Sequence, residues 1–473
     1  MPRLLQFIRS LITGRTSRLL KAICGTAHYL SYTLEPHRDP KPYLPHPIHR
    51  LPPELLSEII YQSTPPRYGG IRERRKILAL SHVCRHWRSV ALSTPSLWTF
   101  IYLQCMESTF DRELDCARAW LSRSRQLPIS VILEMMDVVA PSVEAAFRVL
   151  TPHCARWREF SLPVRFLGLH ILSSVRGNLP LLESAEFSVS ISHELSDAFV
   201  IAPRLRRLRL HLRDPLRSLV LVKNVPWMQL THVELDTYIT PAVHDIIASA
   251  SNVVCLRVYL RDHVRGAEPQ TITHPNISTL DVGGHDDDNA ASCLMDHLVL
   301  PALRRLVLSQ PWKCAIFLVA RSACTLSSLK IPMFNGCDFV ALLKLSPALQ
   351  DLAITLVSAD EWAVVVDALT FQGGMQLVPK LRSLDIRCVL KSNAGTSTDM
   401  TPFADMVASR WKPEDVAPEL DPLVRSTLNH VKVVIWVWKN LHFPVTARTR
   451  LRQFVAEGLP LSLLAGYTLR GLL

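Results

Sequence analysis

Side chains that could do chemistry are few in this chain of 473 residues, and none of them stands in a catalytic spacing. The sequence has no glycine-rich phosphate loop, no Gly-x-Ser-x-Gly nucleophile motif, no His-Glu-x-x-His zinc motif and no EF-hand loop. Hydrolases, phosphoryl-transfer enzymes and metalloproteases commonly rely on one of these arrangements. The sequence therefore predicts a protein that is not an enzyme and needs no cofactor.

Two clusters contain residue types that bind metals. His82 and His86 lie four residues apart around Cys84, a spacing that can hold a metal ion on a helix. His285 precedes three aspartates, residues 286–288. No further ligand run lies near the first cluster, so solvated histidines beside a core cysteine are favoured. For the second cluster, a solvated loop with one aspartate capping the next helix is favoured over a cation site. No metal site is predicted.

The eleven cysteines are scattered without Cys-x-x-Cys spacing. Their odd number and apolar neighbours predict reduced, buried thiols in an intracellular protein, with Cys314, Cys324 and Cys337 in the core. No apolar run reaches the roughly 20 residues of a membrane-spanning helix, so no transmembrane segment is expected.

The net charge of +12 is concentrated near the N-terminus. Residues 1–50 carry eight Lys and Arg against two Asp and Glu, and residues 51–100 carry seven against three. The remaining 373 residues carry 38 against 36. Nucleic-acid binding needs a concentrated basic face. The long C-terminal part is therefore not expected to bind nucleic acid.

Residues 47–98 contain two amphipathic helix patterns and a closing Pro-Ser-Leu-Trp. The apolar stripe of the first pattern consists of Leu51, Leu55, Leu56, Ile59 and Ile60. That of the second consists of Leu80, Val83, Cys84, Trp87 and Ala91. Pro52 and Pro53 suit a helix start, where the backbone N–H has no partner. Domains below about 40 residues rarely bury a sufficient core alone. Another protein should therefore cover the surplus apolar surface.

The stretches LPPELLSEI, SHVCRHWRSVA and PSLW resemble an F-box, the module that docks substrate receptors onto the Skp-type adaptor of cullin–RING (SCF) ubiquitin ligases. The resemblance departs only in the long connection from Tyr61 to Lys76. Lengthening a surface loop costs only about 0.6 kcal/mol per doubling. The resemblance implies an all-α F-box-like domain at residues 47–100. The residues implied to contact the adaptor or to shape the docking helices are Leu51, Pro52, Leu55, Leu56, Ile59, Val83, Cys84, Trp87 and Trp98.

An N-terminal extension of basic character, residues 1–46, precedes this module. Leu4, Ile8, Leu11 and Ile12 could form one face of a helix, as in a mitochondrial presequence or a membrane-surface helix. A solvated tail ending in a proline-rich linker at residues 37–47 is favoured, because F-box receptors work in the cytoplasm or nucleus.

A pattern of apolar-x-x-apolar-x-apolar occurs ten times, from WREFSL (157–162) to LRSLDI (381–386). Successive starts lie 23 to 32 residues apart. The pattern resembles a leucine-rich repeat, although the usual Asn or Cys after the strand is missing. Helix starts between strands are signalled at Thr240–Pro241 and by a capping box at Ser358 and Glu361. The predicted fold class is α/β: a small N-terminal all-α F-box followed by a leucine-rich-repeat-like solenoid at residues 101–390, with parallel strands concave and helices convex.

Residues 391–421 are polar and turn-rich, and predict a loop carrying one short helix. Residues 422–473 again contain a strand pattern and a helix pattern. A repeat stack needs caps that cover its last apolar layer, so this C-terminal strand and helix are predicted to close the solenoid.

The concave face is the expected target-binding surface, because the non-core strand positions point outward there. Charges of both signs are mixed on it, which suits a protein partner better than a polyanion. Ordinary solvated strand positions are the alternative for any one residue. The residues predicted to bind the target are Arg207, Arg209, His232, Glu234, Arg257, Asp281, Arg305, Lys330 and Asp385.

Together these features predict the substrate-recognition subunit of an SCF-type E3 ubiquitin ligase, cytoplasmic or nuclear. Its partners would be the Skp-type adaptor, through it a cullin, and an unknown target protein. No homo-oligomer, nucleic acid or membrane partner is implied. Two alternatives remain open. One is a repeat scaffold outside any ligase, whose helical hairpin only caps the stack. The other is a membrane- or nucleic-acid-associated protein that uses the basic N-terminus.

Overall fold

The chain divides into two compact units. The computed structural model describes residues 51–63, 71–135, 140–162, 172, 174–189, 197–212, 225–239, 241–263, 270–284, 288–310, 313–332, 336–371, 377–388, 398–411, 428–435, 441–465 and 470–471. Unit 1 comprises Met1–Ser188 and Ser192–Leu205, and unit 2 comprises Val189–Ile191 and Arg206–Leu473. This division does not coincide with the boundaries predicted near residues 100 and 390. The basic N-terminal extension, residues 1–46, lies outside the described residues.

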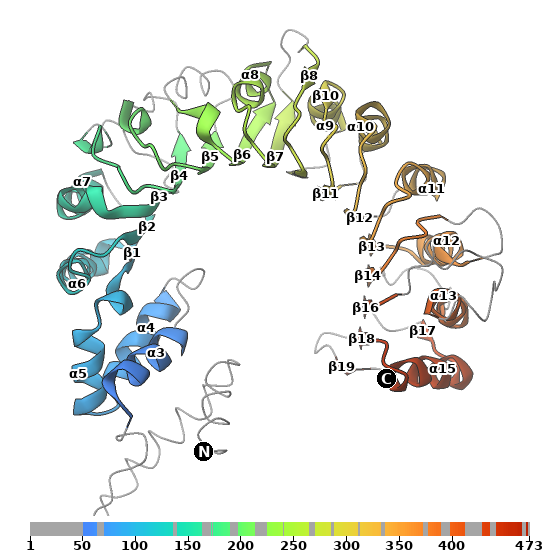
Figure 1. The fold of residues 1–473 in the computed structure, drawn as a ribbon, viewed down its shortest axis with the longest axis horizontal. Coiled ribbons are helices and arrows are strands. Elements are labelled where there is room, and N and C mark those ends of the chain that lie inside the picture. Colours follow the sequence, from blue (N-terminus) through green and yellow to red (C-terminus); the bar gives the residue numbers. More distant parts are fainter. Residues whose placement is uncertain are drawn as a thin grey trace, which may run out of the picture. The chain divides into compact units, whose positions relative to one another are not determined.

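Three short helices and a 3-10 turn begin unit 1: α3 (Pro53–Ser63), α4 (Ile71–Ser81), α5 (Arg85–Ser93) and η3 (Pro95–Trp98) (Figure 1). Helix α3 begins at Pro53, as the sequence predicted. The single helix predicted through Leu80 and Trp87 is wrong, because the chain turns between α4 and α5. Cys84 there has an extended backbone (φ −161°, ψ 174°) and is the N-cap of α5. Residues 71–76, predicted as connection, belong to α4.

Four parallel strands follow in unit 1, in the order β1 (Phe100–Cys105), β2 (Ile129–Met135), β3 (Trp157–Leu162) and β4 (Ser184–Val189). The connections contain η4 (Glu107–Thr109), α6 (Phe110–Arg123), α7 (Ala140–Leu150), η5 (Thr151–Arg156) and η7 (Asp197–Phe199). Aromatic rings fill the core. The rings of Trp157 and Phe160 are stacked with centroids 4.4 Å apart, and Phe187 is fully buried beside Phe160.

Unit 2 continues the same strand pattern. Its parallel strands are β5 (Arg207–Leu212), β6 (His232–Ile239), β7 (Cys255–His263), β9 (Thr279–Gly284), β11 (Arg305–Leu308), β12 (Ser328–Pro332), β13 (Asp351–Leu356), β14 (Ser383–Cys388), β16 (His430–Ile435) and β18 (Leu461–Ala465), and β19 (Arg470–Gly471) adds an antiparallel end. A strand begins within each of the ten predicted repeat units. The predicted fold class, an α-helical module followed by an α/β solenoid of parallel strands, is confirmed.

The helices of unit 2 lie on the outer side of its strands (Figure 1). They are η9 (Trp227–Gln229), α8 (Pro241–Ser249), α9 (Asp288–Met295), α10 (Cys314–Ser322), α11 (Gly336–Lys344), α12 (Ala359–Leu369), α13 (Thr401–Trp411) and α15 (Val445–Ala456). Two short strand pairs, β8 (Ile272–Thr273) with β10 (Leu298–Val299) and β15 (Thr398–Asp399) with β17 (Leu441–His442), accompany them. The capping box of Ser358 and Glu361 is confirmed at the start of α12.

Basic side chains from a later repeat stabilise helix ends in an earlier one. Arg321 donates to the carbonyl of Met295 at 2.6 Å, at the end of α9. Arg410, only 3% exposed, donates to the carbonyls of Leu369 at the end of α12 and of Leu377 at 2.9 Å. The last carbonyls of a helix have no partner within the helix and carry partial negative charge. Burial lowers the pKa of Arg410 to about 10, which still leaves the guanidinium charged at neutral pH.

The predicted loop at residues 391–421 supplies a packed helix. Helix α13 buries Phe403, Met406 and Val407 completely, and β16 pairs in parallel register with β14. Strand β18, which no pattern had indicated, pairs in turn with β16. The strand stack therefore continues beyond β14. Within the described residues, no helix combines the length and apolar character needed to cross a bilayer.

Candidate protein-binding surfaces

Helix α3 has one buried apolar face and one exposed leucine. Leu56 and Ile60 are fully buried, whereas Leu55 is 55% exposed. Of the residues implied to serve adaptor docking, Pro52 and Leu55 are exposed; Leu51, Ile59, Val83 and Cys84 are half-buried; and Leu56, Trp87 and Trp98 are buried. The first two groups are available to a partner. The buried group holds the helices together, which is the shaping role that the resemblance implied.

Two further leucines are exposed on the neighbouring helices. Leu78 on α4 is 36% exposed and Leu92 on α5 is 38% exposed. Both lie off the apolar stripes, so the periodicity of the sequence did not single them out. Only their exposure in the folded structure identifies them, because a single surface leucine forms no sequence pattern.

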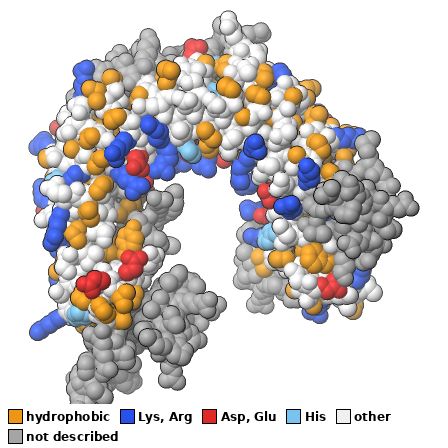
Figure 2. Space-filling view, viewed as in Figure 1, with side chains coloured by type: hydrophobic (Ala, Val, Ile, Leu, Met, Phe, Trp, Pro, Cys, Tyr) orange, Lys and Arg blue, Asp and Glu red, His pale blue; other side chains and the backbone are white. Residues whose placement is uncertain are grey.

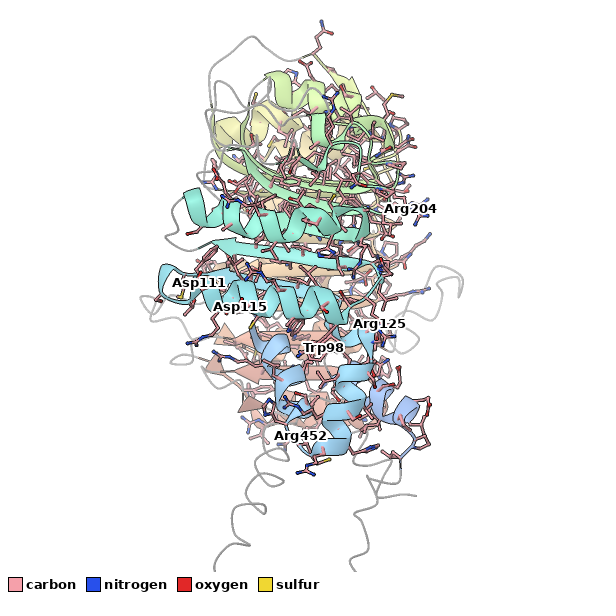
Figure 3. The ribbon with its side chains drawn as sticks, turned by 90° about the vertical axis from the view of Figure 1, so that its left-hand side faces the viewer. Trp98, Asp111, Asp115, Arg125, Arg204 and Arg452 are labelled. Atoms are coloured by element: carbon pink, nitrogen blue, oxygen red, sulfur yellow. The ribbon has the colours of Figure 1, made fainter. Side chains whose placement is uncertain are left out.

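Trp98 connects the three short helices to α6. Its indole Nε1 donates to the carbonyl of Ala91 at 2.9 Å, and its ring meets the edge of Trp120 on α6 with centroids 5.1 Å apart. The guanidinium of Arg123, also on α6, lies 4.5 Å from the Trp98 ring centroid. Figure 3 shows Trp98 between α6 and the short helices. This end of the helical module is therefore sealed by the chain's own later residues.

The residue types that could bind metals do not converge in the described part of the chain. His82 is exposed and His86 is half-buried, with a buried Nε2 that has no hydrogen-bond partner. No group of three or more His, Cys, Asp or Glu able to hold a metal is found among the described residues. Residues 285–287 lie outside them. Cys314 and Cys324 are buried as predicted, but the prediction for Cys337 is wrong, since it is exposed on α11.

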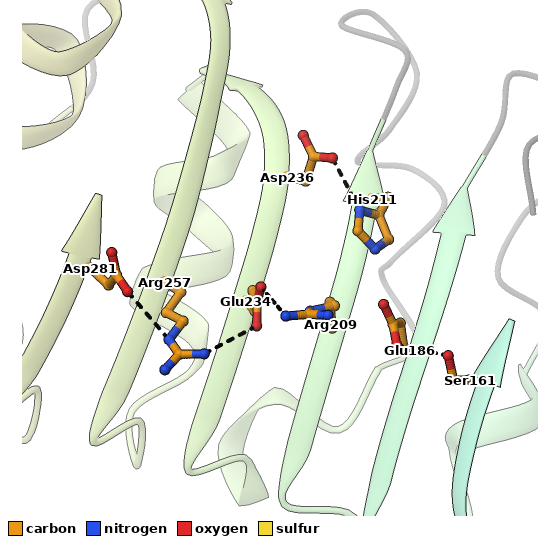
Figure 4. Close-up of polar contacts among 8 residues, drawn as sticks. All are labelled: Ser161, Glu186, Arg209, His211, Glu234, Asp236, Arg257 and Asp281. Carbon is orange, nitrogen blue, oxygen red and sulfur yellow. Dashed lines mark hydrogen bonds and ion pairs between the residues drawn. The ribbon is translucent and has the colours of Figure 1, made fainter. Parts of the chain in front are cut away.

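The parallel register of unit 2 aligns charged side chains in rows across its strands. In the central row, Arg209, Glu234, Arg257 and Asp281 are successive register partners on β5, β6, β7 and β9. An Nη2 of Arg209 lies 2.5 Å from Glu234 Oε1, and Arg257 Nε lies 3.5 Å from Asp281 Oδ2 (Figure 4). Arg257 also reaches Glu234, with 3.8 Å between Nη1 and Oε2. Alternating charge thus links four strands.

A second polar cluster lies two residues further along the same strands. Asp236 accepts two hydrogen bonds from Arg261, at 2.6 and 2.7 Å, and its Oδ2 lies 3.1 Å from Nδ1 of His211. Burial alone would raise the pKa of Asp236, but the hydrogen bonds from His211 and Arg261 and the charge of Arg261 lower it to about 2. Sequence reasoning missed this cluster, although His211 and Asp236 follow predicted face residues by two positions and Arg261 follows Arg257 by four, which keeps all three on the same face.

The row at the strand starts contains Arg207, His232 and Arg305, three of the predicted target-binding residues. Burial and the charges of Arg207 and Arg257 lower the pKa of His232, which favours its neutral form. Burial also raises the pKa of Asp281, against the opposing charges of Arg257 and Lys330. Basic, acidic and histidine side chains alternate along this strand face in Figure 2.

Lys330 and Asp385 continue the central row beyond the ion-paired strands. Lys330 on β12 is a register partner of Val307 and Ala353, and Asp385 on β14 is a register partner of Ala353. Asp385 is ion-paired with Arg387 on the same strand, with 3.5 Å between Oδ2 and Nη2. All nine predicted target-binding residues therefore share two adjacent rows of one strand face. The central-row members on β5 to β9 are ion-paired with each other.

On the strand face of unit 1, two acidic side chains accept hydrogen bonds from hydroxyl groups. The Tyr102 hydroxyl donates to Glu134, and Ser161 donates to Glu186 at 2.7 Å. Arg158 on β3 forms an ion pair with Glu183, 3.0 Å away. Neither residue belongs to the rows in which Glu159 pairs with Ser184 and Ser161 with Glu186. Glu134 and Glu186 on the described strands of unit 1 therefore each accept a hydrogen bond from a hydroxyl group.

The helical module at the start of unit 1 corresponds to a known family. Residues 48–104 match the F-box-like family model. No curated protein matches the chain. Among solved structures, the chain is similar to an internalin (inlF) from Listeria monocytogenes str. 4b F2365, with 11% identity over 74% of this chain and 76% of that one. The TM-score is 0.27, so that likeness carries no weight here, and the solenoid assignment rests on the repeated strands themselves. The F-box-like domain thus includes α3, α4, α5, η3 and all but the last residue of β1.

Proposed function

We propose that this protein is the substrate-recognition subunit of an SCF-type E3 ubiquitin ligase, working in the cytoplasm or nucleus. The observation that carries the proposal is the F-box-like match over residues 48–104 together with the exposed Leu55 on α3. A leucine side chain that is 55% exposed, next to half-buried Leu51 and Ile59, provides an apolar anchor for a partner. A Skp-type adaptor would cover this surface and connect the chain to a cullin.

The solenoid would supply the second contact. Its strand face offers long, charged side chains on a rigid parallel sheet, and such faces favour specific binding of a complementary protein surface. The chain itself would break no bond. It would hold the target near a ubiquitin-loaded enzyme on the same complex, which raises the effective concentration of the reacting groups.

Replacing Leu55 with aspartate tests this function. Because the side chain is largely exposed, Leu55→Asp should leave the fold intact and place a charge within the adaptor interface. Central apolar contacts contribute about 2 kcal/mol or more, so adaptor affinity should fall by at least roughly 30-fold. The measurement is titration of the purified Skp-type adaptor into the full chain, with the melting temperature recorded in parallel.

A matched control is Leu345→Asp, which changes a leucine that is 38% exposed directly after α11 in unit 2. This variant should bind the adaptor like the unmodified chain. Equal adaptor binding by the Leu55→Asp variant and the unmodified chain would contradict the docking surface. Absence of adaptor binding by the unmodified chain would contradict the ligase role itself.

A repeat scaffold outside any ligase is the second candidate function, and the packing of Trp98 against Trp120 favours it. That contact packs the end of the helical module against α6, and a capping role would require such packing. A stably folded chain that fails to bind the adaptor would select this candidate. The third possibility, a membrane or nucleic-acid contact through the basic N-terminus, involves residues outside the described ones.

A further inference from the structure

Two cations on the strand face of unit 2 differ from their neighbours. Arg209 and Arg257 are ion-paired with Glu234 and Asp281. Arg305 and Lys330 are exposed, and no hydrogen bond or ion pair to either side chain is found within the described residues. Both influence Asp281 only as more distant charges. Their positive charge is therefore available to a partner.

The sheet register sets the distance between Arg305 and Lys330. Arg305 is on β11 and Lys330 on the adjacent β12, one strand further across and one row further along. With about 4.8 Å between strands and about 6.8 Å between same-face residues, their Cα atoms lie roughly 8 Å apart. Same-face side chains of an extended peptide are about 6.8 Å apart. Two carboxylates two residues apart can therefore reach both cations at once.

An exposed aromatic side chain lies on the same strand face, two strands from Arg305. Tyr259 on β7 is 44% exposed and is the register partner of Gly283 on β9. A Cβ atom at residue 283 would lie 3.1 Å from Tyr259 Cδ2, closer than ordinary van der Waals contact, so glycine allows the ring to lie against the neighbouring strand. Partly exposed tyrosine and arginine are the residue types that most often dominate protein interfaces.

We propose that Arg305 and Lys330 bind an acidic, extended segment of the target protein. This inference rests on the proposed function, since it names the chemical class of the target. Separated cations fit spaced carboxylates better than a single phosphate group, which needs donors that converge on one point. Glu234 and Asp281 on the same face disfavour a continuous polyanion such as nucleic acid.

The test uses a fluorescein-labelled peptide, Glu-Ala-Glu-Leu-Glu-Ala-Glu-Ala, and fluorescence anisotropy with the full chain at low salt. Arg305→Glu and Lys330→Glu should each weaken binding by about fivefold or more, because each replaces attraction with repulsion. The matched controls are Arg304→Glu and Lys344→Glu, which make the same charge changes at exposed positions outside the face rows. Their affinities should stay within about twofold of the unmodified chain.

Four results would overturn the proposal. They are equal weakening by the control variants, equal binding of the glutamine version of the peptide, tighter binding of a phosphoserine version, and tighter binding of single-stranded DNA. Arg305→Gln and circular dichroism separate lost binding from lost folding. Adaptor binding by Arg305→Glu should be unchanged and peptide binding by Leu55→Asp should be unchanged. A failure of the ligase assignment would then appear only in the adaptor titration, and a failure of this site only in the peptide titration.

Discussion

The F-box-like helices and the strand face of unit 2 use opposite chemistry to present a surface. Leu55 is an apolar side chain on a short helix, held in place by buried Leu56 and Ile60 beneath it. On the strand face, Arg209, Glu234 and their neighbours are charged side chains fixed by the sheet register. Burial of an apolar anchor is insensitive to salt, whereas contacts between exposed charges are screened by it. One surface suits a constant partner and the other suits discrimination among partners.

The largest expected effect separates packing from docking inside the F-box-like domain. Trp98→Ala removes a fully buried indole that contacts Trp120 and Arg123. Truncating a buried tryptophan typically costs about 3–5 kcal/mol, so the free energy of unfolding of unit 1 should fall by that amount. Urea denaturation measures it. Trp98→Phe, which keeps an aromatic ring, should lose less, and a loss below about 1 kcal/mol for alanine would show that Trp98 does not fasten the helices to the repeats.

A smaller effect is expected on the strand face at low pH. The pKa of Asp236 is lowered to about 2 in the folded chain, so its carboxylate stabilises the fold above its unfolded pKa of about 3.9, and this contribution is lost as the pH falls toward 2. Asp236→Asn should cost about 1–2 kcal/mol of unfolding free energy at pH 7 and reduce the loss of stability between about pH 5 and pH 2. Urea unfolding at several pH values checks this, with Asp351→Asn at an exposed position of β13 as control. An unchanged pH dependence in Asp236→Asn would contradict the cluster.

The smallest effect concerns the central row. Arg209 and Glu234 are 41% and 33% exposed, so their coupling energy should be only about 0.5–1 kcal/mol and should decrease with salt. A double-mutant cycle with Arg209→Gln and Glu234→Gln measures this coupling. A coupling above about 2 kcal/mol would mean that the row is a structural element of the fold, rather than a surface that can exchange its contacts for those of a partner.

Much of the solenoid was predictable because each repeat needs the same apolar positions. Leu208, Leu210, Val233 and Leu235 are all buried, as the alternation required. Strand β18 was not predicted, because its segment lacks the first apolar residue of the repeat pattern. Gly458 adopts φ +104° after α15 and stands where earlier units have an apolar residue, and Ser462 follows in the next strand. Strand β16 begins within LNHVKV (428–433), which has the same apolar pattern as the repeats. That segment starts 47 residues after LRSLDI, beyond the 23 to 32 residues that separate the other units.

The candidate surfaces were predictable only in part. Strand alternation placed Arg257 and Lys330 on one face, but sequence cannot tell that Arg257 is neutralised by Asp281 while Lys330 is not, because that depends on which strands are neighbours. The turn at Cys84 was missed because the apolar spacing of Leu80 and Trp87 continues through it. Periodicity reports burial, and it cannot distinguish one continuous helix from two helices that bury the same face.

Hydrogen–deuterium exchange of the full chain, with and without the Skp-type adaptor, tests most directly whether the two surfaces serve separate partners. Adaptor binding should slow exchange of the backbone amides in α3, around Leu55, and leave β7 to β12 unchanged. Slower exchange within β7 to β12, or an unaltered α3 in the presence of saturating adaptor, would contradict the account.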